Sequence, residues 1–118
     1  MSCLFDSIST FVAESPATLR QQACDYLAKN GPLFDDKRAA EVVTPEYIQQ
    51  MRHRSTWGGG IEIRALSEQL NLIIVVSGPA TRRAIVFRPI RPAIGARHAF
   101  LSYNGSHYEP MPPIIYQG

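Results

Sequence analysis

The sequence predicts an α+β fold in which helices flank a small, mostly antiparallel sheet. Apolar residues recur at helical spacing up to Asn71, whereas the apolar runs beyond it are short and extended. Asn104-Gly105 separates two of those extended runs, and this dipeptide is typical of a tight hairpin. With 118 residues, of which 45% are hydrophobic, residues 1–118 are expected to form a single domain with one modest core.

Two helices are expected before Gly31. The first begins at or beside Cys3 and extends for about three turns. Its apolar stripe contains Leu4, Ile8, Phe11 and Val12. The second begins at Ser15-Pro16, an N-cap residue followed by proline at the first helical position, and ends at Asn30-Gly31. Its inward stripe contains Leu19, Ala23, Tyr26 and Leu27.

Two further helices are expected before the first strand. Thr44-Pro45 repeats the start signal, and Arg52 and Arg54 suit the C-terminal end of that helix. Residues 35–43, just before it, form either a short helix or only a turn. Trp57-Gly58-Gly59-Gly60 then interrupts the helical pattern, because three consecutive glycines lose much backbone entropy inside a regular element. The helical spacing resumes after the glycines.

The remaining sequence predicts strands joined by turns and one loop. The expected strands lie at 72–76, 84–87, 100–103 and 107–109. The first is apolar throughout, which indicates burial on both faces. Ser77-Gly78-Pro79 turns the chain after it, residues 88–97 form a proline-containing loop, and Asn104-Gly105 makes the final hairpin.

Charge and composition argue against several functional classes. The net charge is only +2 and the twelve Lys and Arg residues are spread out, so neither nucleic acid nor a membrane surface is an expected partner. No apolar run is long enough to cross a bilayer, and residues 1–15 lack the pattern of a signal peptide. The two cysteines make neither a disulfide framework nor a zinc site. We therefore expect a soluble, cytoplasmic monomer without a metal or cofactor.

Cys3 is the candidate nucleophile. At a helix N-terminus its sulfur lies near the positive end of the helix dipole, which favours the reactive thiolate. The alternative is that Cys3 is only a small apolar residue at a frayed end of the chain. Cys24 lies among core-type residues of the second helix, so we expect it to be a buried structural thiol.

Three histidines compete for the role of general base. His53 lies between arginines at a helix end and His98 is expected in a loop, so both should be solvated surface groups. His107 stands beside a tight turn, where a rigid scaffold can aim its side chain. Glu109, two residues further along a strand, points to the same face and could hold the imidazole ring. Asn104 is the other candidate for this third role.

Four motifs follow one another along the chain. They are Ser2-Cys3-Leu4-Phe5, Trp57-Gly58-Gly59 with Ile61-Glu62-Ile63-Arg64-Ala65-Leu66, the strand Ile73-Ile74-Val75-Val76, and Tyr103 through His107-Tyr108-Glu109. In this order they resemble the ovarian-tumour (OTU) family of cysteine proteases. The resemblance covers practically the whole chain, and it is specific because all four motifs occur in the right sequence and spacing.

The resemblance implies a papain-like thiol hydrolase, a deubiquitinase that cuts the isopeptide or peptide bond after the C-terminal Gly-Gly of ubiquitin or a ubiquitin-like protein. It implies Cys3 as the nucleophile, His107 as the general base, and Glu109 as the third member, where the family usually has Asp or Asn. The substrate groove would contain Trp57, Gly58, Gly59 and Tyr108. The alternative for the first three is a tryptophan packed on the core, with glycines in a tight turn.

The sequence departs from the family pattern just before Cys3. Family members usually have Asp-Gly-x-Cys, and the residues before the cysteine form part of the oxyanion hole, whereas only Met1 and Ser2 precede Cys3 here. The Cys3 amide supplies one donor, and the loss of a second typically costs about 3 kcal/mol. We therefore expect a slow enzyme, or one that substrate binding completes.

Other functions remain as alternatives. The chain could be a ubiquitin-binding module that kept the fold and lost catalysis, or a compact protease of the viral type that processes polyproteins. Nucleic-acid binding would weaken steeply with salt and would use Arg82, Arg83, Arg88, Arg91 and Arg97. The surfaces expected to touch a modifier are this arginine-rich loop and residues 35–54.

Overall fold

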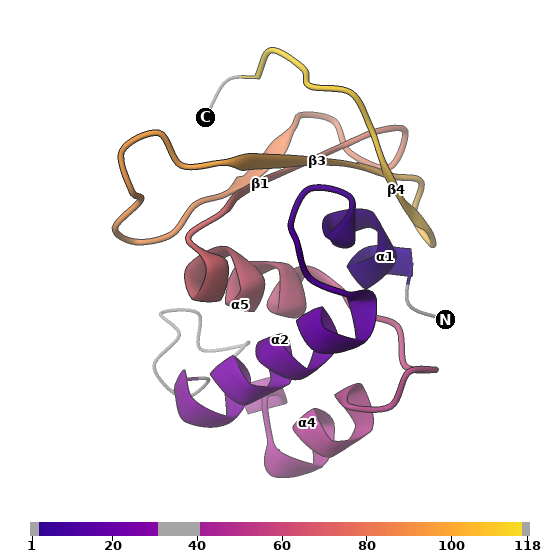
Figure 1. Cartoon of the computed structure of the whole chain (residues 1–118). Helices are drawn as coiled ribbons and strands as arrows, with labels where there is room; N and C mark the ends of the chain where they lie inside the picture. The colour runs from indigo at the N-terminus through magenta and orange to yellow at the C-terminus, as the bar shows by residue number, and fades with distance from the viewer. Residues whose placement is uncertain (1–2, 31–40, 117–118) are drawn as a thin grey trace.

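The computed structural model describes residues 3–30 and 41–116. The helices come first along the chain: α1 (Cys3–Ser9), α2 (Pro16–Asn30), α4 (Pro45–Met51) and α5 (Gly60–Leu70). The strands follow: β1 (Ile73–Ser77), β2 (Ile85–Phe87), β3 (His98–Tyr103) and β4 (Tyr108–Pro110). In Figure 1 the sheet forms one layer, with α1 and α5 beneath it and α2 and α4 further away. This arrangement confirms the predicted α+β class.

Local capping explains where α2 and α4 begin. The Ser15 hydroxyl accepts a hydrogen bond from the Thr18 N–H at 3.1 Å, and the Thr44 hydroxyl accepts one from the Tyr47 N–H at 3.1 Å. A proline follows each cap at a position where the helix needs no N–H donor. Both helix starts therefore agree with the prediction from sequence.

α1 is shorter than the three turns that the apolar stripe predicts. The Ser9 hydroxyl binds the Asp6 carbonyl oxygen at 2.6 Å, which offers the backbone an alternative to further helix. The Phe11 N–H then donates to the Ile8 carbonyl oxygen at 2.9 Å. This bond spans three residues, as in a 3₁₀-helix, and it closes the last turn. Phe11 and Val12 pack against the core from outside the helix.

The strands of the described chain form one sheet in the order β2-β1-β3-β4. β1 pairs antiparallel with β2 and parallel with β3, and β3 pairs antiparallel with β4. The prediction of a mostly antiparallel sheet is therefore confirmed, with one parallel pair at its centre. Because β1 and β3 are the two central strands, β2 and β4 lie on opposite edges of the sheet.

β1 is buried on both faces, as its apolar run predicts. Ile74 and Val76 pack with the helices in the main core, whereas Ile73 and Val75 belong to a second cluster on the other face. The segment 111–116 packs against this second cluster and runs over the sheet (Figure 1). The sheet is thus covered by helices on one face and by the C-terminal segment on the other.

The prediction that His98 lies in a solvated loop is wrong. β3 begins at His98, two residues earlier than predicted, because the parallel ladder pairs His98 with Ile73. The ring is partly buried: it stacks on Phe100 with 5.7 Å between centroids, and its Nε2 lies 2.7 Å from the Tyr116 hydroxyl. His53, by contrast, is exposed as predicted.

The predicted element at 35–43 lies largely outside the described residues, although Glu41 and Val42 are helical. Residues 88–97 form an irregular loop, as expected. Within the described ranges, no helix combines the length and hydropathy that crossing a membrane would require.

Candidate active site

Cys3 is the first residue of α1 and is partly buried. The next two residues, Leu4 and Phe5, are fully buried in the main core and anchor the helix. The Ser7 hydroxyl adds a hydrogen bond to the Cys3 carbonyl oxygen at 2.7 Å. Cys3 therefore stands at a helix start, as predicted, and is held there by its neighbours. Cys24 is fully buried, also as predicted.

α1 packs against β4, so the first helix of the chain lies beside the strand that follows His107 (Figure 1). Tyr108, in β4, contacts the main core and stacks on Tyr103 with 4.4 Å between ring centroids. Burial, assisted by Tyr103, Cys3 and Glu62, raises the pKa of Tyr108 to about 12. Because α1 packs on β4, the helix that begins with Cys3 lies against the strand that follows His107.

His107 is the last residue of the turn between β3 and β4. The side-chain oxygen of Asn104 accepts hydrogen bonds from the His107 N–H at 2.8 Å and the Ser106 N–H at 3.0 Å. The Asn104 N–H donates to the His107 carbonyl oxygen at 3.2 Å, and Gly105 supplies the positive φ of 105°. The backbone of His107 is therefore fixed by the turn.

The carboxylate of Glu109 lies beside the His107 ring. Its Oε1 is 3.6 Å from the His107 Nε2, a distance too long for a hydrogen bond but suited to an ion pair when the imidazole is protonated. Both side chains are substantially exposed, at 43% for His107 and 69% for Glu109. Nδ1 is then the ring nitrogen that Glu109 leaves available. Asn104, the other candidate, uses its side-chain oxygen on the backbone of the turn.

Gly58 brings the Trp57–Gly59 segment against α1. A Cβ at Gly58 would lie 2.8 Å from Leu4 Cδ2 and 3.0 Å from Phe5 Cε2, so a side chain there would displace one or both. Trp57 is 56% exposed, so it is not a tryptophan packed on the core. Gly59 is the N-cap of α5. The segment thus lies beside the helix that begins with the candidate nucleophile.

Glu62 is a buried carboxylate in this region whose role the sequence reasoning missed. It is 1% exposed, and its Oε1 accepts a hydrogen bond from the Gly59 N–H at 2.8 Å. Its Oε2 accepts one from the Tyr47 hydroxyl at 2.5 Å. Burial raises the pKa of Glu62, although these two hydrogen bonds and Arg20 oppose the rise. The available signal was its position three residues after the N-cap, where glutamate often binds the N–H of the cap residue.

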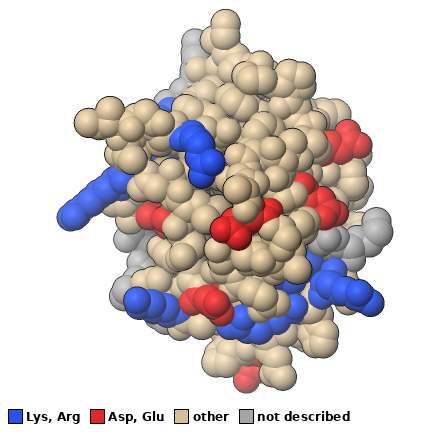
Figure 2. Space-filling model, viewed as in Figure 1, with Lys and Arg blue, Asp and Glu red and all other residues tan. Residues whose placement is uncertain are grey.

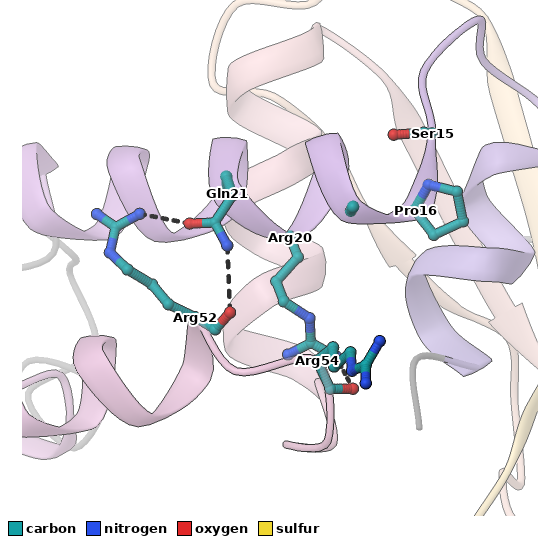
Figure 3. A pocket seen from close by; sticks show the side chains of 7 residues that line it. Ser15, Pro16, Arg20, Gln21, Arg52 and Arg54 are labelled. Atoms are coloured by element: carbon teal, nitrogen blue, oxygen red, sulfur yellow. Dashed lines mark hydrogen bonds between the residues drawn. The ribbon is translucent and has the colours of Figure 1, made fainter.

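A hollow of about 400 Å³ opens between the start of α2 and the end of α4 (Figure 3). Its lining consists of Ser15, Pro16, Ala17, Arg20, Gln21, Arg52 and Arg54. Arg20, only 2% exposed, donates to the Met51 carbonyl oxygen at 2.7 Å and to the Arg54 carbonyl oxygen at 3.2 Å. Arg52 and Gln21 bind each other through two hydrogen bonds. None of the predicted catalytic or groove residues lines this hollow, although Arg52 and Arg54 belong to the 35–54 segment that was expected to touch a modifier. The hydrogen bonds of Arg20 and Arg52 join α2 to the end of α4.

This chain is similar to a known family of proteins. Residues 2–109 match the OTU family of OTU-like cysteine proteases. Ubiquitin thioesterase otu2 of Schizosaccharomyces pombe is 29% identical over 129 residues, which cover 93% of this chain and 42% of the relative. Ubiquitin thioesterase OTU1 of Rattus norvegicus is 31% identical over 117 residues, covering 93% and 33%. The chain therefore spans about a third to two fifths of the length of these curated relatives.

Solved structures show the same fold. An OTU domain in complex with ubiquitin matches with a TM-score of 0.72 at 26% identity, covering 92% of this chain and 62% of that chain. The viral OTU domain protease of Dera Ghazi Khan virus matches with a TM-score of 0.65 at 21% identity, covering 92% and 72%. These matches confirm the papain-like OTU fold that the motifs predict. By the match of residues 2–109, the chain belongs to the family of OTU-like cysteine proteases.

Proposed function

We propose that the chain acts as a deubiquitinase, hydrolysing the bond after the C-terminal Gly-Gly of ubiquitin or a ubiquitin-like protein. The observation that carries the proposal is the packing of α1, which begins at Cys3, against β4, which follows His107. The curated relatives are ubiquitin thioesterases, and one structural neighbour is an OTU domain bound to ubiquitin. Both facts support ubiquitin conjugates as the substrate class.

In the proposed reaction, His107 takes the proton of the Cys3 thiol, and the thiolate attacks the glycyl carbonyl carbon. The protonated His107 then gives its proton to the departing lysine amine as the C–N bond breaks, leaving a thioester on Cys3. Water, deprotonated by His107, hydrolyses the thioester and restores the thiol. The Cys3 N–H would donate one hydrogen bond to the oxyanion. Met1 and Ser2, which precede it, lie outside the described residues.

Two residues are proposed to support His107 in different ways. Glu109 would stabilise the imidazolium through its charge, and Asn104 would fix the backbone through the turn. Because the Glu109 carboxylate is exposed and 3.6 Å away, Glu109→Gln should lower kcat by no more than about fivefold. Asn104→Ala removes two backbone hydrogen bonds and should lower kcat by about tenfold. Turnover of ubiquitin carrying a C-terminal fluorophore measures both.

The matched control for Asn104 is Asn104→Asp, which keeps the oxygen that accepts from the His107 N–H and should restore most of the turnover. A loss in Glu109→Gln that exceeds the loss in Asn104→Ala would contradict this division of roles. It would instead make the charge of Glu109 the main support of His107.

Two measurements distinguish the proposed enzyme from a ubiquitin-binding module without catalytic activity. The wild-type chain should release a fluorophore from the C-terminus of ubiquitin, and a ubiquitin probe with a C-terminal electrophile should form a one-to-one adduct at Cys3, located by mass spectrometry. Binding of ubiquitin in a titration, with neither release nor adduct at high protein concentration, would reject the enzyme and favour the binding module.

Nucleic acid is not among the partners that we propose. On the face shown in Figure 2, Lys and Arg side chains lie among Asp and Glu rather than in one continuous basic patch. Affinity for phosphate backbones depends on clustered positive charge. We retain a monomer in the cytoplasm, without nucleic-acid or membrane partners, as part of the proposal.

A further inference from the structure

The Trp57–Gly59 segment belongs to a connection whose two ends are held by buried charged side chains. At its start, the Arg20 guanidinium binds the carbonyl oxygens of Met51 and Arg54. At its end, the Glu62 carboxylate binds the Gly59 N–H at 2.8 Å. Between these two contacts, residues 52–59 join α4 to α5 without regular secondary structure. The connection is therefore fixed by specific polar contacts at both ends.

Glu62 reaches across two helices as well as to the glycines. It lies in the first turn of α5, and its Oε2 binds the hydroxyl of Tyr47 in α4, at 2.5 Å. A buried carboxylate is costly unless it is hydrogen-bonded, and an apolar residue of similar volume often serves a core equally well. The presence of Glu62 at 1% exposure therefore indicates a requirement for its hydrogen bonds rather than for its packing.

The backbone that Glu62 binds is tightly packed against α1. Gly59, which Glu62 binds, directly follows Gly58, and Gly58 packs so closely on α1 that a Cβ would lie 2.8 Å from Leu4 Cδ2. Leu4 in turn directly follows Cys3 in α1. A shift of the Gly59 backbone would thus change the space between the Trp57–Gly59 segment and the helix that begins with Cys3.

We propose that Glu62, together with Tyr47, is a positioning residue: it sets the place of the Trp57–Gly59 segment beside Cys3, and thereby the fit of the substrate's C-terminal tail. The proposal rests on the proposed deubiquitinase function. Glu62 does not touch the reacting atoms in this role. It acts through the Gly59 N–H, so its loss should weaken substrate binding more than it slows the chemical step.

Trp57 provides a direct readout of the segment, because it is the single tryptophan of the chain. Glu62→Gln and Tyr47→Phe keep the shape of each side chain and weaken the hydrogen bonds to the segment and to α4. The matched control is Glu68→Gln, the same change on the same helix, because the Glu68 Oε1 accepts from the Ile90 N–H at 2.7 Å in the 88–97 loop. Thermal unfolding shows that each variant is folded at the assay temperature.

The expected result has a spectroscopic and a kinetic part. Quenching of Trp57 fluorescence by acrylamide should rise in Glu62→Gln and Tyr47→Phe and stay unchanged in Glu68→Gln. With ubiquitin carrying a C-terminal fluorophore, kcat/KM of the first two variants should fall about tenfold, mainly through KM. Alkylation of Cys3 by iodoacetamide should keep its wild-type rate, because the nucleophile itself is untouched.

Folded variants with wild-type quenching and wild-type KM would overturn the proposal, and so would an equal rise of Trp57 quenching in Glu68→Gln. If the wild-type chain hydrolyses no ubiquitin substrate, the proposed function fails on its own. The quenching of Trp57 then still decides whether Glu62 sets the place of the segment.

Discussion

Replacing Cys3 by alanine is expected to reduce hydrolysis of ubiquitin C-terminal bonds by at least about a thousandfold. In the proposed reaction the Cys3 sulfur is both the attacking atom and the atom that carries the thioester, and alanine can be neither. The fold should survive, because the core contacts that anchor α1 are made by Leu4 and Phe5, not by Cys3. Release of a C-terminal fluorophore from ubiquitin measures the loss, and circular dichroism checks the fold.

His107→Ala should lower the rate of hydrolysis by about a hundredfold to ten-thousandfold, which is the usual contribution of a general acid and base. The double variant should be no slower than Cys3→Ala, because residues that act as a unit do not add their effects. The matched thiol control is Cys24→Ala, since burial raises the pKa of Cys24 to about 11 and keeps it a thiol. The matched imidazole control is the exposed His53→Ala. Turnover by Cys3→Ala equal to that of either control would reject Cys3 as the nucleophile.

Local signals in the sequence predicted most of the fold. Caps followed by proline located α2 and α4, and Asn104-Gly105 located the final turn, because each of these signals acts on residues within one turn of itself. The sequence did not predict the parallel pairing of β1 with β3 or the early start of β3 at His98. Both depend on contacts between residues about 25 positions apart, which no local pattern encodes.

The same limit applies to the candidate site. Cys3 at a helix start and Glu109 beside His107 were predicted from local spacing, and the structure has both, although His107 lies in the turn just before β4. The hydrogen bond between Glu62 and the partly buried Tyr47 does not follow from local spacing, because the two residues come from different helices and are 15 residues apart. Charged and hydroxyl side chains are expected at the surface, so burial of Glu62 can be read only from the folded chain.

The largest loss of stability is expected for Arg20→Ala, about 3–5 kcal/mol in the free energy of unfolding. The Arg20 guanidinium is 2% exposed and binds the carbonyl oxygens of Met51 and Arg54. It also lies over the Phe5 ring, 4.6 Å from the centroid. Truncation would leave a cavity and two carbonyl groups without this donor, and it would remove one of the contacts between α2 and α1. Urea denaturation followed by circular dichroism measures the change.

Two variants test whether the planar guanidinium of Arg20 stabilises the fold, rather than its positive charge alone. Arg20→Lys should remain about 1–3 kcal/mol less stable than wild type, because the guanidinium reaches the two carbonyl oxygens with two different nitrogens, whereas an ammonium has its donors on a single nitrogen. Arg52→Ala, which removes a largely exposed ion pair with Asp25 and an exposed hydrogen bond to Gln21, should cost at most about 1 kcal/mol. A loss in Arg20→Ala no larger than that in Arg52→Ala would contradict the role of Arg20. If the role holds, activity of Arg20→Lys should fall at lower urea than its global unfolding, because Phe5 anchors the helix that begins with Cys3.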